Sequence, residues 1–175
     1  METTIMSKTP LILFVALTTL LLGSCGDAAE PEATGPSQLD AFWSQDSPSG
    51  AREVLDIRSN AGAGDQIVVT GRIQDFVDGR AFIKMTDSAL KSCLDLDGAD
   101  CSCPTPWDYC CEDPAKVKTH IIGVAFHDEG GRLLREGLKG FNGLDHLQTI
   151  TVTGTVNKDD EGNVIVVATA LHRKG

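Results

Sequence analysis

The chain has 175 residues, of which 41% are hydrophobic, and its 25 acidic residues against 15 lysines and arginines give a formal net charge of −10. This length is enough for one modest hydrophobic core and too short for two. The acidic balance disfavours nucleic acid as a partner, because an acidic surface repels phosphate backbones.

The N-terminal segment predicts export. An apolar run from Leu11 to Leu22 follows Lys8, and it is too short to span a bilayer as a helix, while Gly23 and Ser24 are small residues of the kind found at signal cleavage sites. Leu22-Gly23-Ser24-Cys25 resembles the end of a bacterial lipoprotein signal, in which the cysteine is acylated. We therefore predict a signal peptide over 1–24, lipidation at Cys25, and anchoring in the envelope through the N-terminal lipid. The resemblance favours the outer membrane or the periplasmic face; a plain cleaved signal is the alternative.

Residues 25–50 are predicted to form a flexible tether after the acylated cysteine. The segment is rich in Ala, Glu, Pro, Ser, Gly and Asp, and it has little apolar surface to bury. Phe42 and Trp43 are the side chains of this segment available to dock on the domain. Residues 51–175 are then the single globular domain.

Hydrophobic periodicity predicts a mainly β domain. A short helix over Ala51 to Arg58, capped by Ser47 or Ser49, leads into a hairpin with Asp78-Gly79 at its turn. A second short helix is expected over Arg132 to Lys139. The predicted strands are, in chain order, Ile67 to Phe76, Arg80 to Thr86, His120 to Phe126, Thr149 to Val156 and Val164 to His172.

Five short strands with a helix between the third and fourth is the element order of the OB-fold, a five-stranded Greek-key barrel. The runs Val68 to Ile73 and Thr151 to Val156 share an apolar-x-Gly-x-apolar pattern, which resembles the first and fourth strands of anticodon-binding-type OB domains. The runs Cys103 to Glu112 and Asp159 to Ala168 also resemble a group of uncharacterised exported bacterial lipoproteins. That group supplies no activity to carry over.

Residues 87–119 form a Cys-rich insertion between the second and third strands. A loop of this length inside a compact domain is usually functional or cross-linked. The insertion contains the single tyrosine of the chain and five of its six cysteines, which are Cys93, Cys101, Cys103, Cys110 and Cys111.

Two interpretations of these cysteines stay open. Disulfides suit an exported protein, and a bridge that closes a loop of this size contributes about 3 kcal/mol, yet with Cys25 acylated the remaining count is odd. A thiolate metal site for Zn(II) or Cu(I) accommodates an odd count, although the spacing lacks the paired C-x-x-C knuckles of zinc ribbons. His120 and His127 are additional candidate ligands, each weighed against an ordinary histidine at a strand end.

Thiol redox catalysis is the weakest use of the insertion. Seven carboxylates and one lysine lie between Asp87 and Ala115, and this acidic setting raises thiol pKa values. Trp107 and Tyr109 are candidate ligand contacts that could stack on a base or sugar, but the basic groove of a single-strand binder is missing. We favour the alternative that Trp107 packs the insertion onto the barrel.

The sequence predicts a lipid-anchored cell-envelope binding or scaffold protein, more consistent with a non-enzymatic role than with catalysis. The chain has no serine-centred elbow, no H-E-x-x-H and no phosphate loop, and the Cys-rich insertion is either disulfide-linked or metal-filled. The alternative is a metal-dependent or thiol redox protein that uses the Cys cluster. Binding of single-stranded nucleic acid by the OB face is a third candidate, supported by fold analogy alone. The sequence does not identify a protein or small-molecule partner.

Overall fold

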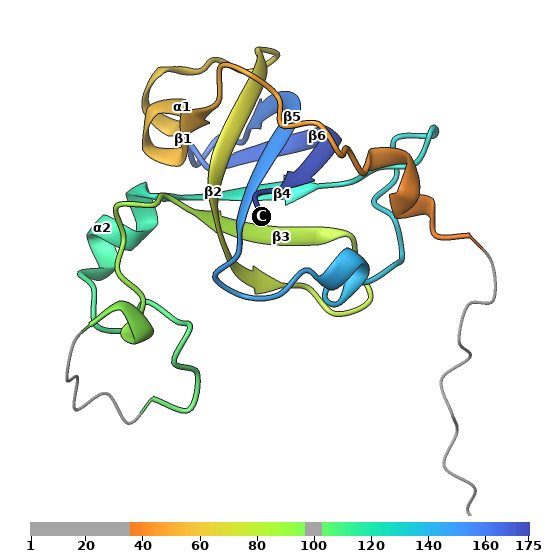
Figure 1. Ribbon diagram of the computed structural model, residues 1–175. Helices are drawn as coiled ribbons and strands as arrows, with labels where there is room; N and C mark the ends of the chain where they lie inside the picture. The colour runs from red at the N-terminus through yellow and green to blue at the C-terminus, as the bar shows by residue number, and fades with distance from the viewer. Residues whose placement is uncertain (1–35, 97–102) are drawn as a thin grey trace, which may run out of the picture. The chain divides into compact units, whose positions relative to one another are not determined.

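The computed structural model describes residues 36–96 and 103–175 (Figure 1). The predicted signal peptide, Cys25, the first part of the predicted tether and Cys101 lie outside the described residues. The strands are β1 (Arg52–Glu53), β2 (Gln66–Phe76), β3 (Phe82–Thr86), β4 (Ile121–Ala125), β5 (Thr149–Lys158) and β6 (Val164–Arg173). The helices are α1 (Val54–Asn60) and α2 (Pro114–Thr119), with 3-10 turns η1 (Gln38–Phe42), η2 (Cys93–Asp95) and η3 (Phe141–Gly143).

Strands β2 to β6 form a closed barrel. They are hydrogen-bonded in the order β2-β3-β4-β6-β5, and β2 also pairs antiparallel with β5, which closes the sheet on itself. Strands β4 and β6 are parallel, while the other pairs within the barrel are antiparallel. The predicted fold class, a mainly β five-stranded OB-type barrel with a Cys-rich insertion between its second and third strands, is confirmed.

The barrel interior is filled by alternate residues of each strand. In β5, Ile150, Val152 and Val156 are buried, whereas Thr149, Thr153 and Thr155 on the opposite side are partly exposed. This is the alternation predicted from the period-two pattern of the sequence. One contiguous cluster of buried aliphatic and aromatic side chains makes up the core.

Both predicted helices are corrected by the structure. Residues 132–139 are irregular, with a bridge between His127 and Leu133, and the short helical element of this connection is the 3-10 turn η3. The first helix begins at Val54 instead of Ala51, because Arg52–Glu53 pair with β2 as the short parallel strand β1. Neither predicted serine caps it. The first-turn amide of Leu55 donates instead to the carboxylate of Asp87, a residue distant in sequence.

The described part of the predicted tether belongs to the domain. Leu39 is 1% exposed in the core, and the rings of Phe42 and Trp43 pack edge-on against Phe126 and Phe141. The Ser44 amide also donates to the Leu171 carbonyl at 2.8 Å. The expectation that Phe42 and Trp43 dock agrees with these contacts, and residues 39–44 pack on the barrel. No helix in the described part of the chain is long and apolar enough to cross a bilayer.

Gly71, at the middle of β2, lies where the barrel leaves no room for a side chain. A Cβ atom built there would be 2.5 Å from the Thr86 carbonyl oxygen and 2.9 Å from Val54 Cγ2. The mid-strand glycine predicted from the OB-like pattern therefore permits close contact between β2, β3 and α1.

Gly71→Ala is expected to lower the free energy of unfolding by about 1–3 kcal/mol, because the backbone of β3 must move to admit a methyl group. Urea unfolding of the purified chain measures the change. Gly62→Ala is the matched control, since a Cβ at that position makes only ordinary contacts of 3.7 Å or more. Equal stability of the two variants would contradict this account of the β2–β3 contact.

Candidate metal centre in the insertion

The buried residue Asp87 lies at the base of the insertion, where the two ends of the insertion meet. Asp87 is 4% exposed; its Oδ2 atom accepts from the Leu55 amide at 2.8 Å, and its Oδ1 atom accepts from the Ala89 amide at 2.9 Å. The Asp87 amide donates to the His120 carbonyl at 2.9 Å. Asp87 therefore fixes the end of β3, the start of β4 and the first turn of α1 relative to one another.

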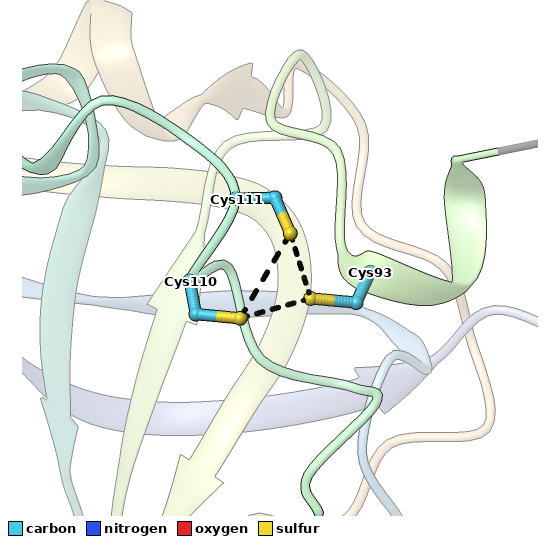
Figure 2. Close-up of side chains that lie close together, drawn as sticks. All are labelled: Cys93, Cys110 and Cys111. Atoms are coloured by element: carbon cyan, nitrogen blue, oxygen red, sulfur yellow. Dashed lines mark hydrogen bonds between the residues drawn. The ribbon is translucent and has the colours of Figure 1, made fainter. Parts of the chain in front are cut away.

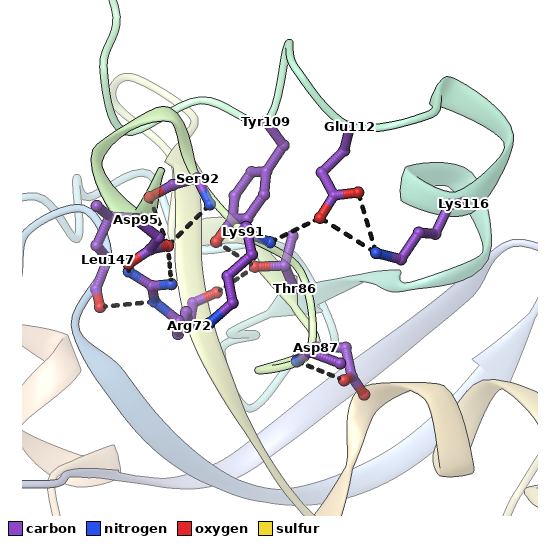
Figure 3. A network of polar contacts seen from close by, with 11 residues as sticks. Arg72, Thr86, Asp87, Lys91, Ser92, Asp95, Tyr109, Glu112, Lys116 and Leu147 are labelled. Atoms are coloured by element: carbon purple, nitrogen blue, oxygen red, sulfur yellow. Dashed lines mark hydrogen bonds and ion pairs between the residues drawn. The ribbon is translucent and has the colours of Figure 1, made fainter. Parts of the chain in front are cut away.

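Tyr109 anchors the middle of the insertion to the barrel. Its ring is 2% exposed, and its hydroxyl is hydrogen-bonded to the buried Thr86 hydroxyl at 2.9 Å (Figure 3). Burial raises the pKa of the Tyr109 phenol above its ordinary value. Because the Tyr109 ring is buried, it has no exposed face on which a ligand could stack.

Arg72 of β2 holds a second point of the insertion. Its guanidinium donates to both carboxylate oxygens of Asp95, and the amide and hydroxyl of Ser92 donate to Asp95 Oδ2 at 2.8 and 2.7 Å. The Arg72 hydrogen bonds lower the pKa of Asp95 to about 2. Ser92 and Asp95 form a capping box around the turn η2, which contains Cys93.

Trp107 provides a third contact with the barrel. Its ring stacks on His146 with the centroids 4.6 Å apart, and His146 meets Phe76 of β2 edge-on at 5.2 Å. The favoured prediction, that Trp107 packs the insertion onto the barrel, agrees with this geometry. Sequence reasoning missed His146, because nothing in its local spacing links it to a tryptophan almost forty residues earlier.

Backbone hydrogen bonds bring the two halves of the insertion side by side. The Cys93 amide donates to the Asp108 carbonyl at 2.9 Å, and the Leu94 amide donates to the Pro106 carbonyl at 3.0 Å. The Lys91 amide and the Lys116 ammonium both donate to Glu112, and they lower the pKa of this carboxyl (Figure 3). Cys93, Cys110 and Cys111 therefore lie next to residues that are themselves held in place.

Three of the predicted cysteines, Cys93, Cys110 and Cys111, converge, and Cys103 lies near two of them. The Sγ atom of Cys93 is 3.2 Å from that of Cys110, 3.6 Å from that of Cys111 and 3.8 Å from that of Cys103. Cys110 Sγ is 2.8 Å from Cys103 Sγ and 4.0 Å from Cys111 Sγ. Figure 2 shows the sulfur atoms of Cys93, Cys110 and Cys111 pointing toward one another from η2 and from the chain segment before α2.

These distances suit thiolates around one ion. With Zn–S bonds of about 2.3 Å, adjacent sulfurs of a tetrahedral site lie about 3.8 Å apart. Three of the five measured separations, at 3.6, 3.8 and 4.0 Å, are close to that value. Cys110 is too near Cys93 and Cys103 and would move outward, which its exposed position permits. All five separations exceed the S–S bond length of about 2.05 Å.

The predicted histidine ligands lie elsewhere. His120 follows α2, with its Nδ1 atom 2.8 Å from the Lys116 carbonyl oxygen, and His127 lies at the other end of β4 in the bridge with Leu133. Among the described residues, the group of closely spaced candidate ligands consists of Cys93, Cys110 and Cys111 and includes neither histidine.

The acidic setting of the cysteines is partly neutralised. Asp95 pairs with Arg72 from the barrel, and Glu112 pairs with Lys116 from α2. Sequence proximity alone showed seven carboxylates facing one lysine, because both cations lie outside the segment that was counted. The excess of negative charge around the sulfurs is therefore smaller than the sequence suggests.

No family model and no curated protein matches this chain. A solved structure described as "OBody AM1L10 bound to hen egg-white lysozyme" is similar with a TM-score of 0.39 and 14% identity, over 73% of this chain and 94% of that chain. The barrel assignment rests on the strand pairing given above.

The Arg72–Asp95 interaction is expected to stabilise the fold in a pH-dependent manner. The pKa of Asp95 in the folded chain is about 2, below its ordinary 3.8, so the contribution is complete above pH 4 and is lost as the pH falls towards 2. A double-mutant cycle of Arg72→Met and Asp95→Asn, measured by urea unfolding, should give a coupling of about 1 kcal/mol at pH 5, since the pair is partly screened by solvent. A coupling that stays constant down to pH 2 would contradict it.

Proposed function

We propose that this protein is a lipid-anchored cell-envelope protein whose OB-type barrel presents a thiolate metal site, and that its role is metal binding without catalysis. The ligands are Cys93, Cys103, Cys110 and Cys111, and the metal is a thiophilic ion such as Zn(II) or Cu(I). The observation that carries the proposal is the convergence of Cys93, Cys110 and Cys111, with Cys103 Sγ 3.8 Å from Cys93 Sγ and 2.8 Å from Cys110 Sγ.

The barrel supports this role by holding the ligands before any ion binds. Cys93 lies in the turn fixed by Ser92, Asp95 and Arg72, and Cys110 follows the buried Tyr109 directly. A binding site that is held in place loses less conformational freedom when it takes a ligand. Thiolates are the ligands that favour Zn(II) and Cu(I) among biological metals.

A disulfide-linked scaffold is the second candidate. It is favoured by the Cys103–Cys110 separation of 2.8 Å, the shortest of the measured sulfur pairs. A bridge there would take Cys110 out of the set of metal ligands, and the two functions are therefore alternatives for the same side chains. Metal binding fits the three pairs near 3.8 Å better.

The envelope part of the proposal rests on the sequence. The apolar run, the small residues after it and Cys25 match the order of a lipoprotein signal. Cys25 precedes the barrel in the chain, so lipid on this residue would anchor the barrel through its N-terminal segment.

The chain purified from membranes in mild detergent, under reducing and anaerobic conditions, is expected to hold one thiophilic metal ion per chain. Elemental analysis gives the stoichiometry, and Co(II) substitution should produce a sulfur-to-metal charge-transfer absorption. Cys93→Ser should weaken the affinity by more than about 100-fold, since even loss of an outer contact costs 10–100-fold. Cys25→Ser, which lies outside the insertion and is purified from the soluble fraction, is the control and should keep the metal.

The disulfide alternative gives a different result in a parallel preparation made without reductant, with free thiols blocked by alkylation at lysis. A metal-free chain whose mass is lower by about two mass units for each bridge would replace the metal site with a cross-linked scaffold. Binding of oligonucleotides at low ionic strength would instead favour the OB face as a nucleic-acid site, a result that the net charge of −10 leads us not to expect.

Cys25→Ser is also expected to release the protein from the membrane, because a thioether-linked lipid has no attachment point on serine. Detergent phase partitioning of cell extracts measures the change, and mass spectrometry of the N-terminal peptide shows whether acyl chains are present. Cys93→Ser is the matched control and should stay in the detergent phase. Membrane association of the Cys25→Ser chain would argue against lipidation at this cysteine.

A further inference from the structure

The cysteine residues of the cluster differ in their exposure to solvent. Cys93 is 5% exposed and Cys103 is partly buried, whereas Cys110 and Cys111 are both exposed. A zinc site with four protein ligands has no open position, so an entering ligand must displace one of the four sulfurs. Two ligands of this site are reachable from outside, and the buried Cys93 holds the ion on the side of the barrel.

A cavity of about 330 Å³ opens beside one of the exposed sulfurs. It is lined by Cys110 and by Pro114, Val117 and Lys118 of α2, together with Asp108 and Glu112. The apolar residues of α2 form one side, which suits a small neutral molecule. The helix is held against the loop by the Lys116–Glu112 ion pair.

The charge around the site selects what can enter. Four thiolates around a divalent ion carry a net charge of −2, and the cavity is lined by two carboxylates, Asp108 and Glu112, and one cation, Lys118, so negative charge is in excess. Anionic oxygen chelators are repelled by this charge. A thiol is neutral below its ordinary pKa of about 8.5, so it can approach the ion and lose its proton only on binding.

We propose that the metal site is an exchangeable one, which passes its ion to an incoming thiol at Cys110, and this inference rests on the proposed metal-binding function. The sulfur of the incoming thiol bonds to the metal as the bond from Cys110 Sγ breaks. The proton lost by the entering thiol is taken up by the released Cys110. Cys93, buried and hydrogen-bonded through its amide to Asp108, is the last ligand to leave.

The test follows transfer of Zn(II) from the loaded full-length chain to a fixed concentration of EDTA while dithiothreitol is varied. Dithiothreitol is a neutral thiol, and threitol, which has hydroxyls in place of the two thiols, is the matched chemical control. We expect the transfer rate to rise in proportion to dithiothreitol and to be unaffected by threitol. Rapid gel filtration followed by metal analysis measures the ion left on the chain.

A cavity-filling variant tests the route. Val117→Trp should slow the thiol-dependent transfer severalfold while keeping one ion per chain, and Val77→Trp, at an exposed valine in the β2–β3 hairpin, should leave the rate unchanged. Circular dichroism checks that both variants are folded.

The outcomes separate the two proposals. One ion per chain that is lost at a rate independent of dithiothreitol, or equal rates for the two valine variants, overturns the exchange inference and leaves metal binding intact. A chain that takes up no ion overturns both.

Discussion

The hydrogen bond between the buried hydroxyls of Thr86 and Tyr109 joins the last residue of β3 to the middle of the insertion. Both residues are almost fully buried, so an unpaired hydroxyl on either side would carry a desolvation cost of about 1–3 kcal/mol. Because Cys110 follows Tyr109 directly, the position of its sulfur is set by the barrel. The insertion is therefore an integral part of the domain. The positions of the clustered sulfur atoms depend on contacts between the insertion and the barrel.

Three other contacts hold the rest of the insertion in position. Asp87 holds the base of the insertion, the Arg72–Asp95 pair holds the turn that contains Cys93, and the Trp107–His146 stack holds the connecting segment. Each contact uses a different kind of interaction. The partners of the insertion are Leu55 of α1, Arg72 of β2, and His146 in the connection before β5. In the proposed metal site, these contacts would keep the ligands together when the ion leaves.

The sequence was most informative where periodicity is regular. All five barrel strands were located to within two residues, because alternation of buried and exposed positions along Ile67–Phe76 or Thr149–Val156 is a local property. The helix expected over Arg132–Lys139 failed because Leu133, Leu134 and Leu138 match helical spacing only loosely, and the chain there is held by the bridge from His127 and by core burial of Leu134 and Leu138. Docking of residues 36–50 was underestimated because Leu39 has no periodic context that shows it is buried.

In the candidate site, too, local sequence patterns predicted which residues matter but not which of them lie close together. The spacing of the cysteines identified which residues belong together but did not determine whether they face one another, since that depends on the pairing of residues 93–94 with 106–108. Tyr109 was the less favoured candidate for ligand stacking, and its burial leaves no exposed ring for that role. The histidines were favoured as ordinary residues at strand ends, and the described group of closely spaced candidate ligands includes neither. Two ion pairs also reduce the negative charge near the sulfurs. Arg72 of β2 and Lys116 of α2 pair with carboxylates of the segment that contains the cysteines. The proposed thiolate site would gain from this, since the paired carboxylates stabilise the scaffold and add little repulsion to the negative charge of a bound metal–thiolate group.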